Sequence, residues 1–168
     1  QATRLLLGEG VKMVVIACNT ASAVALTVLQ ESWDPVPVIG VALTADETAW
    51  LTATKPGGVI LVEQNIGFAP ELRALTNEIH ATNPLLPPLI SVDQEGGLVT
   101  RLTSDPVPGP LELALLPEAE VRELSRVRGE FLAGFGFAVN YAPVADVAYR
   151  PESFMASRSL GSDPASVA

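Results

Sequence analysis

Short apolar runs rich in β-branched residues alternate along this chain with stretches whose apolar residues recur at helical spacing. The runs are typical of strands buried on both faces, and the spaced stretches are typical of amphipathic helices. The runs predict strands over residues 12–18, 36–41, 58–62, 89–92 and 138–147. The spaced stretches predict helices over residues 21–29, 45–53, 71–81 and 118–132.

Two local signals sharpen these helix predictions. Thr44 followed three residues later by Glu47 forms the pattern of a capping box, which places a helix start at this point. Leu72, Leu75 and Ile79 share one face of the helix predicted over 71–81, so we expect that face to be buried.

Strands that alternate with helices predict an α/β protein with a mainly parallel sheet of about five strands. Because crossover connections between parallel strands are right-handed, the sheet is either open and doubly wound or part of a barrel. The glycine pair Gly96-Gly97 and the proline-rich segment 105–110 predict a long loop between the fourth strand and the last helix.

The composition argues against several classes of binding partner. Ten Lys and Arg against nineteen Asp and Glu leave a net charge of −9, which disfavours nucleic acid and anionic membrane surfaces. The longest apolar run, 13–18, is far shorter than the roughly 18 residues of a membrane span. A single cysteine, Cys18, forms no internal disulfide, and no secretory signal is present, so we expect a cytoplasmic protein.

The two ends of the chain carry signals of helices that are cut short. Leu5, Leu6, Leu7 and Val11 fit the last turns of a helix, and Asp163-Pro164 is a helix-start signal close to the last residue. We therefore expect the 168 residues to be a window of a longer polypeptide.

Sites in parallel α/β folds lie at the carboxyl ends of the strands, where three groups of residues qualify. Cys18, with Asn19 and Thr20, follows the first strand, where a helix dipole would lower the thiol pKa; a buried cysteine beside an ordinary helix cap is the alternative. Asp93 and Glu95 follow the fourth strand and suit glycoside hydrolysis or a divalent metal, or else form a capped turn.

Asp146 lies within the apolar fifth strand, upstream of Arg158. A buried aspartate must be paired or hydrogen-bonded, so a structural role is the better prediction for Asp146.

The first segment resembles one known family. Val14-Val15-Ile16-Ala17-Cys18-Asn19-Thr20-Ala21-Ser22-Ala23, followed by the strand over 36–41, resembles the first cysteine motif of glutamate racemases. The resemblance covers residues 1–41 and implies that Cys18 is one of two proton-transferring thiols, with Asn19 and Thr20 in contact with the amino acid. The second cysteine motif of that family and its amino-terminal Asp-Ser motif have no counterpart in this chain.

From about residue 40 onward the chain resembles family 3 glycoside hydrolases, with the bacterial β-N-acetylhexosaminidases of cell-wall recycling as the nearest subgroup. The resemblance covers three quarters of the chain. It rests on motifs that include Leu43-Thr44-Ala45-Asp46-Glu47, Val92-Asp93-Gln94-Glu95-Gly96-Gly97, Val99-Thr100-Arg101-Leu102, Asn140-Tyr141-Ala142-Pro143-Val144-Ala145-Asp146-Val147 and Arg158-Ser159-Leu160-Gly161-Ser162-Asp163-Pro164.

This second resemblance implies a TIM-type barrel and a retaining mechanism whose aspartate nucleophile and histidine acid/base lie beyond residue 168. It implies sugar binding by Asp93, Arg101 and Arg158, and no cofactor or metal. Leu98 and Leu160 depart from the arginine and the aromatic residue usual in the family.

Together these patterns predict a glutamate-racemase-like βα segment over residues 1–41 and a partial, half TIM-type barrel over 42–168. We expect a glycosidase-derived chain that binds carbohydrate containing N-acetylglucosamine, with no turnover by this chain alone. A racemase-derived segment or a chimeric structural fragment without activity is the alternative.

We expect Asp93, Arg101 and Arg158 to converge on one polar pocket, with Cys18 outside it. The open edges of a half barrel also predict self-association.

Overall fold

The computed structural model describes residues 41–167 of the chain. The predicted strand over 12–18, the predicted helix over 21–29 and all but Val41 of the predicted strand over 36–41 lie outside the described residues, as do Cys18, Asn19 and Thr20.

A small parallel sheet forms the centre of the described region. It consists of β1 (Gly58–Ile60), β2 (Leu89–Val92) and β3 (Val139–Asn140), in the spatial order β1-β2-β3. Gly58 pairs with Leu89 and Ser91 pairs with Val139 in the two parallel registers. The prediction of a parallel sheet is confirmed for this part of the chain.

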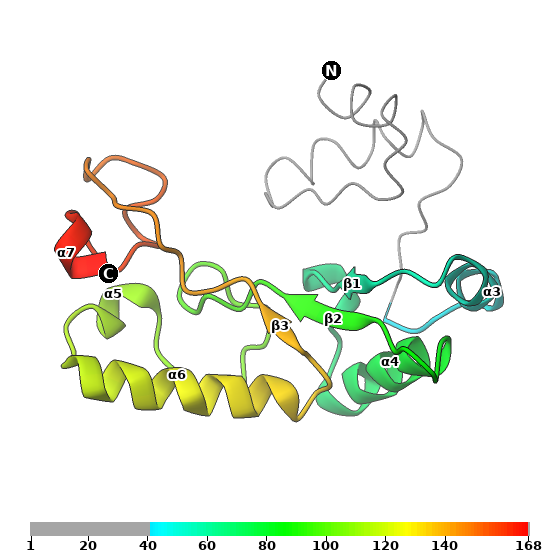
Figure 1. Cartoon of the computed structure of the whole chain (residues 1–168). Helices are drawn as coiled ribbons and strands as arrows, with labels where there is room; N and C mark the ends of the chain where they lie inside the picture. Colours follow the sequence, from blue (N-terminus) through cyan, green and yellow to red (C-terminus); the bar gives the residue numbers. More distant parts are fainter. Residues whose placement is uncertain (1–40, 168) are drawn as a thin grey trace, which may run out of the picture. The chain divides into compact units, whose positions relative to one another are not determined.

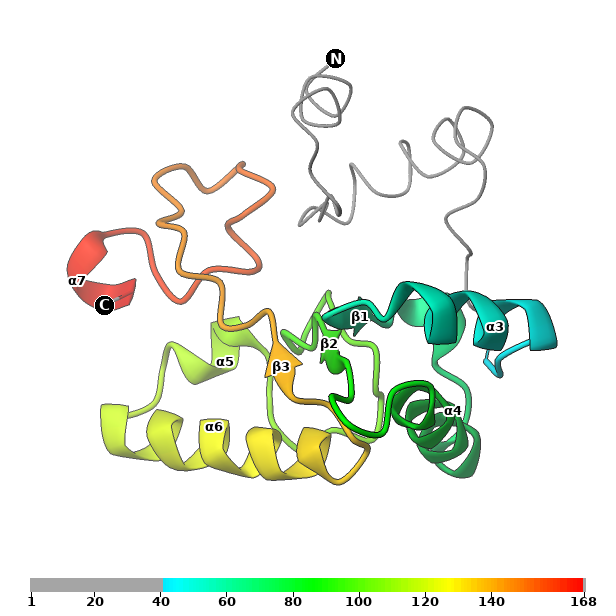
Figure 2. The same ribbon diagram turned by 45° about the vertical axis from the view of Figure 1, so that its right-hand side comes forward.

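Long helices connect the strands and lie against the sheet. Figure 1 shows α4 (Ala69–Ala81) and α6 (Glu118–Ala133) on the same face of the sheet, and the turned view in Figure 2 agrees. This placement follows from two successive crossovers of the same hand between neighbouring parallel strands. The predicted helices over 71–81 and 118–132 are confirmed to within two residues.

The shorter elements are α3 (Ala45–Thr54), a 3-10 turn η1 (Glu63–Asn65), α5 (Pro110–Leu113) and α7 (Pro164–Val167). The predicted capping box is present at the start of α3, where the Thr44 side chain accepts from the Glu47 backbone N–H at 3.2 Å. The Thr44 backbone N–H in turn donates to the Glu47 carboxylate at 2.7 Å. Within residues 41–167 no helix has both the length and the apolar character that crossing a membrane requires.

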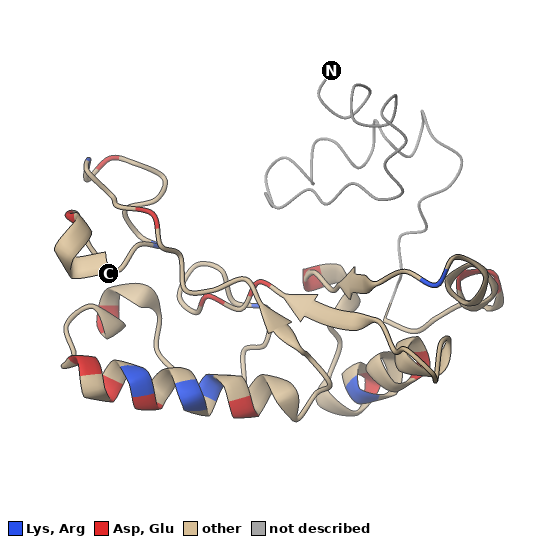
Figure 3. Cartoon of the chain, in the orientation of Figure 1, with Lys and Arg blue, Asp and Glu red and all other residues tan. Residues whose placement is uncertain are grey.

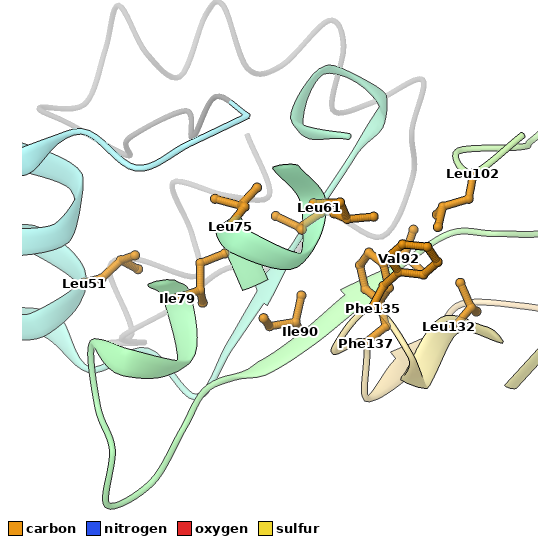
Figure 4. Packing of buried hydrophobic residues seen from close by; sticks show 11 residues of the cluster. Leu51, Leu61, Leu75, Ile79, Ile90, Val92, Leu102, Leu132, Phe135 and Phe137 are labelled. Atoms are coloured by element: carbon orange, nitrogen blue, oxygen red, sulfur yellow. The ribbon is translucent and has the colours of Figure 1, made fainter. Parts of the chain in front are cut away.

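The apolar core lies between the sheet and its helices. Leu72, Leu75 and Ile79 on α4 are at most 1% exposed, as their spacing predicted. They pack with Ile90 and Val92 of β2, both of which are fully buried (Figure 4). Leu132, Phe135 and Phe137 belong to the same core cluster.

The strand predicted over 138–147 is wrong in its extent, because β3 contains only Val139–Asn140. The Tyr141 N–H still donates to the Val92 carbonyl at 2.8 Å, but Pro143 has no N–H to continue a ladder. Beyond this point the chain is irregular, apart from one parallel bridge between Val144 and Ser159.

The shortened strand also overturns the prediction for Asp146. This residue is exposed rather than buried in a strand, because the regular alternation that would have turned it inward has already ended. Its backbone carbonyl accepts a hydrogen bond from the Ser159 hydroxyl at 2.5 Å.

Candidate sugar-binding site

The loop that follows β2 is organised around a fully buried glutamine. The Gln94 side-chain oxygen accepts the backbone N–H groups of Arg101 at 2.7 Å and Leu102 at 2.9 Å. Its amide nitrogen donates to the Leu102 carbonyl at 3.2 Å and to the Asp105 carboxylate at 2.8 Å. One side chain therefore fixes the path of the loop from residue 94 to residue 105.

Gln94 also joins this loop to β3. Its backbone N–H donates to the Asn140 side chain at 2.9 Å, and its carbonyl accepts from the Asn140 amide at 3.0 Å. This two-bond exchange holds the residues directly after β2 against the carboxyl end of β3. Asp93 and Glu95 flank Gln94, so their placement is fixed by the same contacts.

Asp93 is held by Arg101 in a two-point ion pair. The Arg101 Nε donates to Asp93 Oδ1 at 2.7 Å and Nη2 donates to Oδ2 at 2.6 Å, which is the bidentate geometry of a strong charge-assisted pair. The hydrogen bonds that Arg101 donates to Asp93 raise the pKa of Arg101, burial opposes the rise, and the negative charges of Asp93, Glu63 and Glu95 add to it. The Arg101 guanidinium is therefore protonated at neutral pH.

A second two-point pair joins Glu95 to Arg158, 63 residues further along the chain. The Arg158 Nε donates to Glu95 Oε2 at 2.8 Å, and Nη2 donates to Oε1. The guanidinium carbon lies 4.8 Å from the centre of the Phe154 ring, a cation–π distance. The segment after β3 is thereby tied to the loop after β2.

A third arginine, Arg128 on α6, is buried and supports this loop. Its Nε donates to the Asp105 carboxylate at 2.7 Å, and its Nη1 donates to the Glu95 carbonyl at 3.1 Å. Its Nη2 donates to the carbonyls of Val107 at 2.8 Å and Pro108 at 2.9 Å. Figure 3 shows charged residues of both signs in the loops near the carboxyl end of β2.

In the described region Arg101 and Arg158 line two different cavities, where a single pocket was expected. The first has a volume of about 320 Å³ and is lined by Arg101, Glu63, Phe68 and Ser104 among others. The second, of about 160 Å³, is lined by Glu95, Arg128, Asn140, Arg158 and several apolar side chains. Arg101 and Arg158 thus bind different carboxylates, Asp93 and Glu95, and line different cavities.

The structure places the predicted site residues at the expected end of the sheet. Asp93 directly follows β2, Arg101 lies in the same loop, and Arg158 is brought in by Glu95. The roles of Asp93, Arg101 and Arg158 in substrate binding stay predictions. Within the described residues no group of three or more Asp, Glu, His or Cys side chains is gathered as metal ligands would be.

Sequence reasoning missed the residues that build the loop, namely Gln94, Asp105, Arg128 and Asn140. Gln94 lies inside the motif from Asp93 to Gly97, and Asn140 is the first residue of another motif. The sequence analysis predicted no role for either residue. Arg128 carried no signal, since it follows Arg122 and Arg126 in a helix rich in charged residues.

Residues 25–168 match the glycosyl hydrolase family 3 N terminal domain. The chain belongs to this family, and the expected resemblance is confirmed for the region from residue 40 onward. The matched region begins at residue 25, inside the segment that resembles glutamate racemase. That resemblance and the division at residue 41 stay predictions, and the comparisons favour the glycosidase hypothesis over its racemase alternative.

Two curated relatives are β-hexosaminidases. Beta-hexosaminidase LpqI of Mycobacterium tuberculosis is 38% identical over 138 residues, which cover 77% of this chain and 34% of that protein. Beta-hexosaminidase of Alkalilimnicola ehrlichii is 36% identical over 138 residues, covering 76% of this chain and 39% of the relative. The chain thus spans between a third and two fifths of the length of these curated relatives.

Solved structures agree with the family at the level of the fold. NagZ from Neisseria gonorrhoeae, in complex with N-trifluoroacetyl-D-glucosamine, has 27% sequence identity and a TM-score of 0.66, over 77% of this chain and 42% of NagZ. A family 3 β-N-acetylglucosaminidase from Paenibacillus sp. has 30% identity and a TM-score of 0.70, over 77% of this chain and 26% of that enzyme. The fold is therefore the TIM-barrel-like α/β fold of the family.

Proposed function

We propose that this chain supplies the sugar-binding side of a family 3 glycoside hydrolase that acts on β-linked N-acetylglucosaminides, in the recycling of cell-wall material. Family membership and the β-hexosaminidase relatives support this proposal. The proposal places Asp93, Arg101 and Arg158 at the sugar site.

The observation that carries the proposal is the pair of two-point clamps at the carboxyl end of β2. Asp93 offers carboxylate oxygens that accept hydrogen bonds from sugar hydroxyls, and Arg158 offers N–H groups that donate to them. Both side chains are held in place before any ligand arrives, which lowers the entropy cost of binding. An acceptor and a donor fixed on neighbouring segments suit a ligand with adjacent hydroxyl groups.

Calorimetric titration of the chain with N-acetylglucosamine tests the proposal. We expect measurable binding by the wild-type chain and at least about tenfold weaker binding by Asp93→Asn, because a charge-assisted hydrogen bond is lost. Glu118→Gln changes an exposed carboxylate on α6 and is the matched control, with affinity unchanged. Equal affinities of wild type and Asp93→Asn would remove Asp93 from the site.

We also propose cytoplasmic localisation, which the single cysteine supports, and self-association through the sheet edges. β1 and β3 are the outer strands of the described sheet, and outer strands present unpaired backbone groups. Light scattering checks the second point: species larger than one chain are expected, and a monodisperse monomer contradicts it.

A further inference from the structure

The larger of the two cavities, of about 320 Å³, adjoins the first clamp without containing it. Arg101 lines this cavity, whereas Asp93 and Arg158 do not. Its volume falls within the roughly 300 to 1,000 Å³ that is typical of small-molecule sites. The cavity is therefore a candidate binding site to which the proposed function assigns no ligand.

Arg101 presents a hydrogen-bonding edge to this cavity. Its Nε and Nη2 donate to Asp93, which lies outside the lining. Its Nη1 lies 3.6 Å from Glu63 Oε2, too far for a hydrogen bond, and among the described residues Nη1 has no hydrogen-bond acceptor. The Nη1 N–H groups can therefore donate to a ligand, and the Glu63 carboxylate, on a side chain that is 83% exposed, can accept from it.

Hydroxyl groups and an aromatic ring complete the lining. Thr103 and Ser104 are exposed, and their hydroxyls make no hydrogen bond to another described residue. Phe68, which directly precedes α4, is 63% exposed. The lining also includes buried apolar side chains, namely Leu72, Leu102 and Phe135. Donors, acceptors and apolar surface thus meet around one cavity.

Hydrogen bonds that need no ligand hold two segments of the lining in place. The buried Gln94 side chain accepts the backbone N–H groups of Arg101 and Leu102. In the segment before α4, the Ile66 N–H donates to the Glu63 carbonyl at 3.1 Å. A ligand that enters a site formed in advance loses less entropy for ordering its surroundings.

Charge decides which class of ligand suits the cavity. The positive charge of Arg101 is already balanced by Asp93, and Glu63 adds a negative charge to the lining. A carboxylate or a phosphate would be repelled by that charge. Within the described residues no three Asp, Glu, His or Cys side chains gather as ligands for a metal ion. A neutral molecule with hydroxyl groups and an apolar face fits the lining best.

We propose that this cavity binds a pyranose sugar independently of the two clamps. A pyranose ring carries hydroxyl groups around its edge and C–H groups on its faces. Its hydroxyls accept from Arg101 Nη1 and donate to the Glu63 carboxylate, while one apolar face lies on the Phe68 ring. The site goes beyond the proposed function, since the acceptor Asp93 and the donor Arg158 do not belong to it.

Backbone ¹H–¹⁵N NMR with N-acetylglucosamine as the probe tests this site, because it follows each group of amides separately. We expect saturable shifts at residues 66–69 and 103–104, which line the cavity. Phe68→Ala should weaken the binding seen at these amides at least about tenfold, because the apolar contact is lost. The same variant should leave the shifts at residues 93–97 and their midpoint unchanged.

Tyr149→Ala is the matched control, since it truncates another exposed aromatic side chain that lines neither cavity. We expect it to leave both groups of shifts unchanged. Because Phe68 is mostly exposed, Phe68→Ala should fold, which a dispersed amide spectrum checks. Acetate serves as an anionic probe, and we expect it to produce no saturable shifts at residues 66–69.

The absence of saturable shifts at residues 66–69 in the wild-type chain, or an unchanged midpoint there in Phe68→Ala, would overturn the proposal. Saturation of these amides by acetate and not by the sugar would identify an anion site and overturn the choice of a neutral ligand. The proposed function fails separately, through the absence of shifts at residues 93–97 and at the Arg158 Nε–H.

Discussion

Helix α6 carries two kinds of arginine that differ only in where they point. Arg128 faces the loop after β2, and its side chain is 9% exposed against an Asp105 carboxylate that is 2% exposed. Arg122 and Arg126 face solvent and pair with Glu118, Glu123 and Glu130 on the same helix, with side chains more than half exposed. One helix thus carries a buried ion pair that organises a loop and exposed ion pairs between its own residues. Figure 3 shows basic and acidic residues interspersed along α6.

The comparison shows that the contribution of an ion pair to stability depends on how far the pair is exposed to water. An exposed ion pair adds little to the free energy of unfolding, because water solvates both charges and the side chains lose conformational freedom when they pair. A buried pair is costly to create, yet breaking it leaves an unsolvated charge, so its integrity matters much more. In this chain the buried pairs shape the candidate sugar site, and the exposed pairs on α6 leave it untouched.

The largest expected effect comes from the buried arginine. Arg128→Met removes the ion pair with Asp105 and the hydrogen bonds to three loop carbonyls, so we expect the free energy of unfolding to fall by about 3 to 5 kcal/mol. Urea denaturation followed by circular dichroism measures this loss. Arg126→Met, on the exposed face of the same helix, is the control, and similar midpoints for the two variants would refute the contrast between the faces.

Substitutions of two glycines give the next test, because we expect them to change the free energy of unfolding in opposite directions. Gly96 has φ +83°, and a Cβ added there would lie 2.7 Å from Arg128 Nη2, so Gly96→Ala should cost about 2 kcal/mol. Gly129 lies within α6, where an added Cβ meets nothing within 4 Å, so Gly129→Ala should stabilise the chain by about 1 kcal/mol. Denaturation midpoints that move in the same direction would contradict this assignment.

A smaller, pH-dependent effect is expected at the exposed start of α7. The Ser166 hydroxyl, with backbone N–H groups of Ser166 and Ala165, lowers the pKa of Asp163 below 3.8. Since the folded form favours the carboxylate, this capping contribution is present above the ordinary pKa and is lost as the pH falls through the lowered value. Carboxyl ¹³C NMR should give a midpoint below 3.8; a midpoint at or above 3.8 would show that the cap is not formed.

The smallest effect belongs to the exposed pair of Arg122 and Glu118, whose side chains are 78% and 85% exposed. Arg122→Ala should leave both the urea midpoint and the affinity for N-acetylglucosamine at their wild-type values, since the pair is solvated and remote from the loop. A clear loss of stability in this variant would mean that the exposed face of α6 contributes more than its environment allows.

The elements that the sequence predicted well are those whose signals are local. The capping box of Thr44 and Glu47 spans four residues, and the buried face of α4 repeats every three or four, so both could be recognised without knowing the fold. The strand over 138–147 failed because its apolar composition hid Pro143, which ends the ladder. The four-residue helix α5 was too short to show a period.

The residues of the candidate site also divide into those with a local sequence signal and those without one. The motif from Asp93 to Gly97 identified the correct strand end, because its carboxylates and its glycine turn residues are adjacent in the sequence. The partners could not be predicted, since Arg158 reaches Glu95 across 63 residues and Arg128 reaches Asp105 across 23. Only the folded chain distinguishes Arg128 from the other arginines of α6, which differ from it in burial and not in residue type.

The most direct test of this account maps N-acetylglucosamine onto the chain by ¹H–¹⁵N NMR of backbone amides and arginine Nε–H groups. We predict saturable shifts at residues 93–97 and at the Arg158 Nε–H, where the acceptor and the donor are held. Shifts confined to the cavity lined by Phe68 and Ser104, or no shifts at any sugar concentration, would contradict the assignment of the site to the two clamps.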